Sequence, residues 1–303
     1  MFVQKISDKA PHNAFTDLIR FQDRWFVIFR EADLHAKGSL GALRLLSSSD
    51  GAEWKSIAHL THPEWDLRDP KLSLRPDGKL LLTAGATIWE DEETIATQQS
   101  IATLSLDGSA WEPFQRTLPP HEWLWKVTWH QGTAYGVAYN IVDEEWVTSL
   151  WTSQNGLQWK KITTFDIPNR PNETALAFAP DNTLYALVRR NAKPARLAYF
   201  GTSSPPYTTW EWTETKEPLN CPALLCLEGM LFTAGRLLAV TPYGIFAQTL
   251  FGQLENVCLS SPLFLPSRGD CGYPGLLFHN NTFWLSYYSS HEGKSAIYFS
   301  CLY

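Results

Sequence analysis

The stretch SSDGAEW, residues 48–54, recurs along the chain and decides the fold. Its second copy is SLDGSAW at residues 105–111, and its third is SQNGLQW at residues 153–159. A degenerate copy covers residues 202–210, where two prolines and a tyrosine replace the Asp-Gly pair. The tryptophans that end the copies are 57, 48 and 51 residues apart. A period of about 50 residues is typical of one supersecondary unit used many times, as in a propeller.

The residue types of this motif predict its local shape. Ser and Asp or Asn side chains bond to backbone groups two residues further on, and Gly tolerates a positive φ angle. The motif therefore predicts a tight turn between two strands, with its tryptophan, three residues after the glycine, packed as a wedge.

A second repeat lies between these turns and consists of an apolar strand, a polar turn and another apolar strand. Six such hairpins begin near residues 17, 69, 126, 173, 220 and 273. Short runs rich in β-branched and aromatic residues predict strands, and no stretch has the periodicity of an amphipathic helix. We therefore predict an all-β protein: one six-bladed β-propeller domain of four-stranded antiparallel blades over residues 1–303. Residues 2–6 are expected to pair near residues 297–302 and to close the ring as the outer strand of the last blade.

Composition excludes several classes of partner. The net charge is −6 and the pI is near 5.8, so no basic stripe is present to meet the phosphates of a nucleic acid. No apolar run approaches the roughly 18 residues of a membrane helix. The start of the chain has no secretory signal, and the cysteine count of five is odd. These features predict a cytoplasmic protein, taken to be a monomer, with reduced thiols.

Cysteine spacing gives no reason to expect a metal. Cys221 and Cys226 lack the second spaced pair that a zinc site of this type requires. We therefore expect neither a metal ion nor another cofactor.

A propeller brings the start of each inner strand to the central channel on one face, and the end of the second strand returns to that face. The repeated turns lie at the opposite face. The side chains expected to meet at the first face, and to contact a ligand there, are Asp17, Asp69, Glu173 and Tyr273 from strand starts and Arg30, Asp33, His35, Tyr139, Arg189 and Arg236 from strand ends and the loops after them.

The repeated turn resembles the Asp box of the sialidase (neuraminidase) superfamily, in which the box is structural and lies away from the active site. The resemblance covers the whole chain in architecture and implies a carbohydrate substrate. It also implies a substrate carboxylate held by three arginines, a tyrosine nucleophile made basic by a glutamate, and an aspartate as general acid and base. An enzyme of this type is an exo-glycosidase that releases a terminal acidic sugar with retention of configuration.

Positions in the blades carry these roles onto this chain. Tyr273 matches the nucleophile, Glu173 its assisting glutamate, and Arg189 and Arg236 two of the arginines. Asp33 matches the acid, a role for which the neighbouring histidine at position 35 competes. A neutral tyrosine suits this chemistry, because a carboxylate would be repelled by the acid group on the anomeric carbon. Arginine forks bind a carboxylate through two parallel hydrogen bonds.

One stretch departs from the family pattern. The family's first arginine sits in a Phe-Arg-Ile-Pro phrase, and residues 15–18 here are Phe-Thr-Asp-Leu, which puts Asp17 at or beside that place. Arg30 and Arg68 are possible substitutes for the missing cation. An aspartate at this point would repel a substrate carboxylate. Three alternatives therefore stay open: a glycosidase of other specificity that uses Asp17, Asp69 and Glu173, a non-catalytic carbohydrate-binding propeller, and a protein-binding scaffold.

Overall fold

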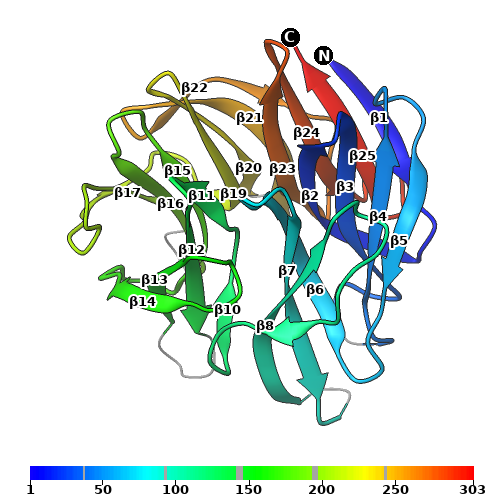
Figure 1. Ribbon diagram of the computed structural model, residues 1–303. Helices are drawn as coiled ribbons and strands as arrows, with labels where there is room; N and C mark the ends of the chain where they lie inside the picture. Colours follow the sequence, from blue (N-terminus) through cyan, green and yellow to red (C-terminus); the bar gives the residue numbers. More distant parts are fainter. Residues whose placement is uncertain (37, 92–93, 141–145, 193–196, 242–243) are drawn as a thin grey trace.

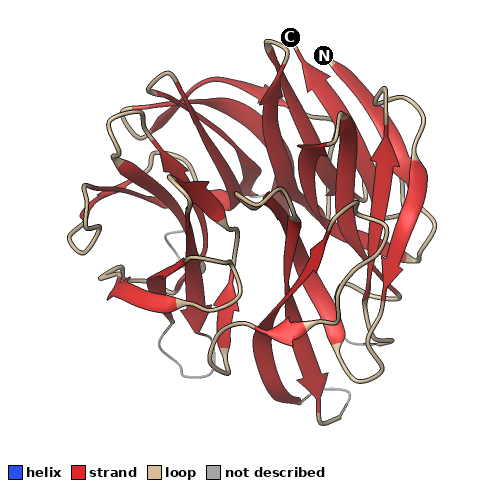
Figure 2. Ribbon diagram, in the orientation of Figure 1, coloured by secondary structure: helices blue, strands red, loops and turns tan. Residues whose placement is uncertain are grey.

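The chain forms a ring of six sheets around a central axis in the computed structural model (Figure 1). The structure describes residues 1–36, 38–91, 94–140, 146–192, 197–241 and 244–303. Every regular element within those ranges is a strand (Figure 2). No helix of the described residues is long and apolar enough to cross a membrane. The predicted all-β, six-bladed propeller of antiparallel blades is confirmed.

The strands of each blade run from the channel outward. The first three blades contain β2 (His12–Phe21), β3 (Arg24–Ala32), β4 (Ala42–Ser48) and β5 (Lys55–Leu60); β6 (Asp66–Leu74), β7 (Leu80–Trp89), β8 (Ile95–Ser105) and β9 (Gln115–Arg116); and β10 (Glu122–Leu124), β11 (Thr128–His130), β12 (Thr133–Asn140), β13 (Val147–Ser153) and β14 (Lys160–Thr164). The last three contain β15 (Pro171–Phe178), β16 (Leu184–Arg190), β17 (Tyr199–Ser203) and β18 (Glu211–Glu214); β19 (Leu219–Leu227), β20 (Met230–Thr241), β21 (Gly244–Glu255) and β22 (Cys258–Phe264); and β23 (Cys271–His279), β24 (Thr282–Ser289), β25 (Ala296–Leu302) and β1 (Phe2–Ser7).

The sixth blade closes the ring with strands from both ends of the chain. β1 pairs antiparallel with β25, so that Phe2 lies opposite Cys301 and Lys5 opposite Tyr298. The two termini lie side by side in Figure 1. This closure is the pairing that the sequence predicts.

The third blade differs from the others at its inner edge. Its inner strand is split into β10 and β11, which pair with the two ends of β12. The predicted start of the inner strand at residue 126 therefore falls in the gap between β10 and β11.

The repeated turns share one hydrogen-bond pattern. In each of the three full copies the serine Oγ accepts the glycine N–H at 2.8 Å, and the tryptophan Nε1 donates to the glycine carbonyl. The Asp or Asn Oδ1 accepts the backbone N–H groups of the two residues that follow the glycine. The degenerate copy keeps the tryptophan bond, from Trp210 Nε1 to the Tyr207 carbonyl at 3.1 Å. Each turn joins the third strand of its blade to the fourth, which puts it at the opposite face from the inner-strand starts.

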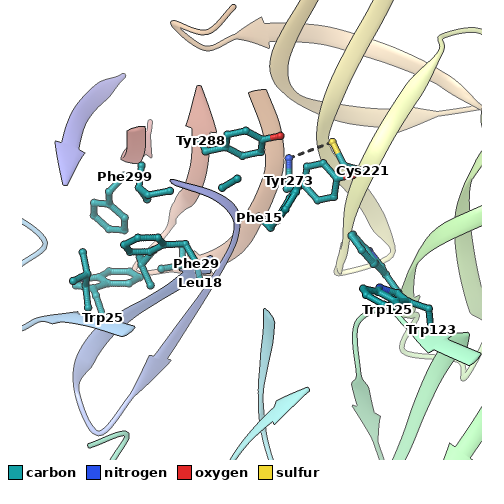
Figure 3. Close-up of a cluster of buried hydrophobic side chains, with 14 of the residues drawn as sticks. Phe15, Leu18, Trp25, Phe29, Trp123, Trp125, Cys221, Tyr273, Tyr288 and Phe299 are labelled. Atoms are coloured by element: carbon teal, nitrogen blue, oxygen red, sulfur yellow. Dashed lines mark hydrogen bonds between the residues drawn. The ribbon is translucent and has the colours of Figure 1, made fainter. Parts of the chain in front are cut away.

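The glycine of each turn also packs on the preceding blade. A Cβ added at Gly108 would lie 2.5 Å from the Phe26 ring, and one at Gly156 would lie 2.4 Å from Leu81. The core accordingly consists of side chains shared between neighbouring blades: one cluster joins Trp25 and Phe29 of the first blade to Phe299 of the sixth (Figure 3). The motif thus serves as the contact between blades.

Candidate active site

The inner strands carry a β-bulge at the same level in five blades. At each bulge two residues of the inner strand stand opposite one residue of the second strand. Bulges re-aim side chains and are frequent beside active sites. The bulged pairs are residues 15–16, 69–70, 172–173, 221–222 and 273–274.

Four of these bulges hold a residue other than glycine at positive φ. The angles are 59° at Phe15, 47° at Asp69, 45° at Cys221 and 50° at Tyr273. Such a conformation is costly for a bulky residue and persists only where its surroundings enforce it. Here neighbouring bulges brace one another: the Tyr273 N–H donates to Cys221 Sγ at 3.2 Å (Figure 3), and Thr16 Oγ1 donates to the Tyr273 carbonyl at 2.8 Å.

The bulges of the fourth and sixth blades bring Tyr273 and Glu173 into contact. The Tyr273 hydroxyl donates to Glu173 Oε1 at 2.6 Å. Arg189 Nη1 lies 2.8 Å from the same Oε1 and 3.3 Å from the Tyr273 hydroxyl. Both Tyr273 and Glu173 are buried, at 9% and 4% exposure. The glutamate is therefore positioned to accept the phenolic proton.

Burial sets the charge state of this group. It raises the pKa of Tyr273 well above its usual value, and the Glu173 carboxylate raises it further against the opposing effect of Arg189. Burial alone would lower the pKa of Arg189, but Glu173 and Tyr273 raise it above its usual value. At neutral pH the tyrosine is thus a neutral phenol and the arginine a cation.

These residues face a cavity of about 290 Å³. One part of its wall is aromatic and comes from Phe15, Trp89, Trp123, Tyr139, Trp146 and Tyr273. The other part is polar and comes from Arg68, Asp69, Thr87, Gln98, Asn172, Glu173, Arg189 and Asn191. An aromatic wall with a few convergent polar groups is typical of a small-ligand site.

Asp69 is the second carboxyl group of the cavity. Burial raises its pKa, against the opposing effects of Arg68 and Lys71. Its Oδ1 is buried and has no hydrogen-bond partner, as is true of Glu173 Oε2. A buried carboxyl group of this kind retains its proton to a higher pH than an exposed one.

Two arginines line the cavity, and a third lies next to Tyr273. Arg68 and Arg189 belong to the wall, and the guanidinium of Arg68 lies 5.2 Å from the centre of the Phe15 ring. Arg236 is not among the described residues of the wall. It lies 5.9 Å from the centre of the Tyr273 ring, and its Nη1 donates to the Cys271 carbonyl at 3.0 Å. Arg236 therefore packs against the ring of Tyr273, and its contact with a ligand stays a prediction.

Asp17 does not reach the cavity, contrary to the sequence prediction. It is buried directly after the bulge, where its Oδ1 pairs with Lys126 Nζ at 2.7 Å and its Oδ2 accepts the Leu72 N–H at 2.8 Å. Phe15 occupies the level at which the other blades present Asp69 and Tyr273. The bulge adds one residue to the strand, so the residues after it face differently from what regular alternation along the strand predicts. Asp17 is therefore neutralised inside the channel, and the expected repulsion of a ligand carboxylate does not arise from it.

Arg30 also lies elsewhere than the sequence prediction puts it, which was at the ligand. Its side chain is fully buried, with Nη2 2.8 Å from Asp66 Oδ1 and Nη1 donating to the Leu34 carbonyl at 2.9 Å. A buried guanidinium needs such partners because leaving it unpaired is costly. Arg30 consequently ties the β3–β4 connection to the second blade and contacts no ligand.

The β3–β4 connection carries the other two predicted residues. Asp33 is exposed and is not among the described residues of the cavity wall, whereas Ala36 of the same connection is. His35 lies beside the wall and bonds through Nδ1 to Asp270 Oδ2 at 2.8 Å. Neither residue is among the described residues of the wall, so the role of acid stays a prediction for both.

A larger cavity, of about 440 Å³, lies further along the channel toward the opposite face. All six blades supply apolar side chains to it, among them Leu18, Leu72, Leu176, Leu224 and Leu276. It brings together no pair of acidic groups in the described part of the chain. The smaller cavity is therefore the candidate active site.

Sequence reasoning missed several wall residues. Trp123 and Trp146 lie in segments that the hairpin pattern left between blades, and Asn172 and Phe15 precede the predicted strand starts. The tryptophan richness of residues 121–129 was an available signal for Trp123. Tyr139, which was predicted, lines the wall, and its ring stacks parallel to Trp146 with centres 6.2 Å apart.

Comparisons with known proteins show likeness in structure alone. No protein-family model matches the sequence, and no curated protein matches it. A structure of a Dyadobacter fermentans protein of unknown function matches 99% of this chain and 98% of its own, with 18% identity and a TM-score of 0.78.

Two further structures are those of glycosidases. An α-L-arabinofuranosidase from Fusarium graminearum, in complex with an iminosugar inhibitor, matches 98% of this chain and 94% of its own, with 13% identity and a TM-score of 0.74. The NanB sialidase of Streptococcus pneumoniae matches 99% of this chain and 70% of its own, with 10% identity and a TM-score of 0.71. At these identities the likeness is one of fold. The chain is a six-bladed β-propeller similar in fold to a sialidase and to an arabinofuranosidase.

Proposed function

We propose that this protein is a glycoside hydrolase that releases a terminal acidic sugar with retention of configuration, with Tyr273 as nucleophile and Glu173 as its base. One observation carries the proposal: the 2.6 Å hydrogen bond from the Tyr273 hydroxyl to Glu173 Oε1 in the wall of an aromatic cavity. A nucleophile bonded to a base that a third group orients is the usual signature of covalent catalysis. Arg189 is that third group.

The reaction proceeds in two displacements. In the first, Tyr273 Oη bonds to the anomeric carbon while its proton passes to Glu173 Oε1, and the leaving oxygen takes a proton from a carboxylic acid. In the second, water attacks the anomeric carbon and gives a proton to the conjugate base of that acid. The tyrosine leaves and recovers its proton from Glu173. The raised pKa of Tyr273 makes this base necessary, because the phenol does not ionise by itself at neutral pH.

We assign the role of acid to Asp69 in place of Asp33. Asp69 lies in the cavity wall, and burial raises its pKa, so the carboxyl group keeps its proton to a higher pH than an exposed aspartate does. Its Oδ1 has no partner within the protein. Asp33 is exposed outside the wall.

An acidic sugar is the substrate class that the charges of the wall favour. Arg68 and Arg189 supply two cations on the same cavity, and the aromatic rings supply faces on which a sugar ring can stack. The volume of about 290 Å³ suits a single terminal sugar residue. The fold likeness to a sialidase supports this class of reaction.

A second candidate is a glycosidase for a neutral sugar that uses Asp69 and Glu173 as its carboxyl pair. The two buried oxygens without partners, Asp69 Oδ1 and Glu173 Oε2, favour it. The likeness in fold to an arabinofuranosidase supports it as well. In this mechanism Tyr273 only orients Glu173.

Activity measurements on a panel of chromogenic sialosides, uronides and arabinofuranosides separate the candidates. We expect the wild type to hydrolyse an acidic sugar, Tyr273→Phe to be inactive, and Glu173→Gln to lose about 10²- to 10⁴-fold in kcat. Tyr287→Phe is the matched control. Tyr287 is in the same blade as Tyr273, but its hydroxyl bonds to the Pro266 carbonyl.

Two outcomes contradict the first proposal. Full activity of Tyr273→Phe together with loss in Glu173→Gln would support the carboxyl pair. Saturable binding of a sugar without turnover of any substrate would make the protein a carbohydrate-binding propeller.

A further inference from the structure

A second cluster of reactive side chains lies beside the cavity, where the first and sixth blades meet. His12 Nε2, His35 Nδ1 and Asp270 Oδ2 all lie within 4.8 Å of one another. His12 is in β2, His35 is on the β3–β4 connection, and Asp270 directly precedes β23. Spacing in the sequence does not reveal this group, because Asp270 is 258 residues from His12 and 235 from His35.

We propose that these three side chains bind one divalent transition-metal ion, with zinc as the preferred metal. Imidazole nitrogens and a carboxylate oxygen are the ligands that Zn²⁺ takes in proteins, and three protein ligands leave one tetrahedral position for water. The donor set therefore fits an open zinc site. The proposal differs from the expectation, drawn from cysteine spacing, that the protein has no metal.

The distances within the group show how the ligands must move to admit the ion. His12 Nε2 and His35 Nδ1 lie 2.9 and 2.8 Å from Asp270 Oδ2, as hydrogen-bonded groups. Ligands about 2.0–2.1 Å from a tetrahedral zinc ion are about 3.3 Å apart, so each nitrogen must move a few tenths of an ångström away from Asp270 Oδ2. The two nitrogens, which lie within 4.8 Å of each other, must settle at the same spacing. The His35 side chain is 48% exposed on a connection, which allows this movement.

Supporting contacts fix the ligands in place. The Tyr288 hydroxyl donates to Asp270 Oδ1 at 2.7 Å, which leaves Oδ2 for the ion. Arg30 Nη1 donates to the carbonyls of Leu34 and His35 and holds the connection that carries the histidine. Hydrogen bonds of this kind orient metal ligands and are part of the site.

The ion would clasp the rim of the candidate active site. The His35 ring lies 5.1 Å from the ring of Phe15, which lies 4.9 Å from that of Tyr273. Ala36, next to His35, lines the cavity. Bound metal would therefore join the first blade to the sixth and hold the β3–β4 connection beside the cavity.

Metal titration of the intact protein tests the proposal. After chelator treatment, Zn²⁺ is added near neutral pH and followed by calorimetry, and Co²⁺ is added and followed by its visible absorption. We expect one equivalent of zinc, a tetrahedral cobalt spectrum and a raised melting temperature. His35→Gln and Asp270→Asn should each weaken zinc binding by more than about 100-fold, and Tyr288→Phe by about 10-fold. His59→Gln is the control, because His59 lies on β5, the outer strand of the first blade. This variant should bind zinc as the wild type does.

The proposal fails if the wild type shows no saturable site or if His35→Gln and Asp270→Asn bind zinc as well as His59→Gln. His35 is exposed on a connection, so its variant keeps the test valid even if Asp270→Asn does not fold. All readouts are independent of glycosidase activity, so the metal site and the proposed function can fail separately.

Discussion

Tyr273 and Glu173 are 100 residues apart in the chain and share one short hydrogen bond inside the ring. Their contact depends on strained backbone, because Tyr273 adopts a φ of 50° at the bulge of its strand. The same device turns Asp69 toward the cavity. Residues held in costly conformations by their surroundings are frequent at functional sites. The chemistry proposed here thus depends on local distortions that recur from blade to blade.

Asp69 gives a test at this scale through the pH dependence of activity. An acid acts only when protonated, so kcat/KM should fall as pH rises through its pKa, which burial raises above the usual carboxyl range. Asp69→Asn should remove this alkaline limb and lower kcat by about 10²- to 10⁴-fold on substrates with poor leaving groups. Asp33→Asn is the control. If Asp33→Asn loses the limb and Asp69→Asn keeps it, the assignment is reversed.

The same variant has an expected effect on stability. The folded protein binds the Asp69 proton more tightly than the unfolded chain does, so this group makes folding less favourable as pH rises above the unfolded pKa. Asp69→Asn should therefore melt at a higher temperature than the wild type at neutral pH, as thermal unfolding by circular dichroism would measure.

The repeated turns are the elements that join blade to blade. Each one bonds its Asp or Asn side chain to two backbone N–H groups and packs its glycine on the preceding blade. Backbone N–H groups from Glu53 and Ala52 and the Ser48 hydroxyl lower the pKa of Asp50 to about 2. The Ser109 hydroxyl and the N–H groups of residues 110 and 109 do the same for Asp107. Asn155 accepts the same backbone bonds in the third copy without a charge.

This difference predicts how the turns respond to acid. A carboxyl group with a lowered pKa stabilises the fold above its unfolded pKa, near 3.8, and this contribution is lost as pH falls toward 2. Asp50→Asn should therefore lose less melting temperature than the wild type between pH 4 and pH 2. Asn155→Asp, the reciprocal change, should lose more. Equal acid dependence in all three proteins would contradict the role given to these carboxylates.

At the scale of the whole molecule, the ring depends on one pairing between the two ends of the chain. β1 supplies the outer strand of the sixth blade, and the proposed metal ligands lie at the same meeting of first and sixth blades. A strand edge without its partner exposes unpaired N–H and C=O groups and promotes aggregation. The blade that β1 completes is thus also one of the two blades that meet at the rim of the cavity.

Removing residues 1–7 tests this closure. The truncated protein should melt well below the wild type and elute partly as aggregates in size-exclusion chromatography, because β25 loses its partner. A circular permutant is the control: a Gly/Ser linker joins the neighbouring termini and the chain is opened at the exposed turn near Gly229. The permutant keeps the sixth blade and should melt near the wild type. An unchanged melting temperature in the truncated protein would contradict the role of β1.

The six repeated hairpins, together with the repeated turn, were sufficient to predict the six blades, their antiparallel strands and the pairing of β1 with β25. Residues at equivalent places in the blades face the same channel, and the resemblance to the sialidase superfamily selected Glu173, Arg189 and Tyr273 among them as residues that meet. Periodicity resolves elements of this size well because each blade repeats the same sequence of strand, turn and strand.

The sequence by itself determined the scaffold and the level in the channel at which the candidate site lies. Only the tertiary structure decided which side chains enter the cavity. A bulge replaced Asp17 by Phe15 at that level, burial drew Arg30 into an ion pair with Asp66, and packing set Arg236 against the ring of Tyr273. It also brought together His12, His35 and Asp270 from distant segments. A one-residue shift at a bulge reverses the direction of the side chains that follow. A buried charge is drawn toward a partner of opposite charge. Neither effect can be recognised in a sequence pattern of strands and turns.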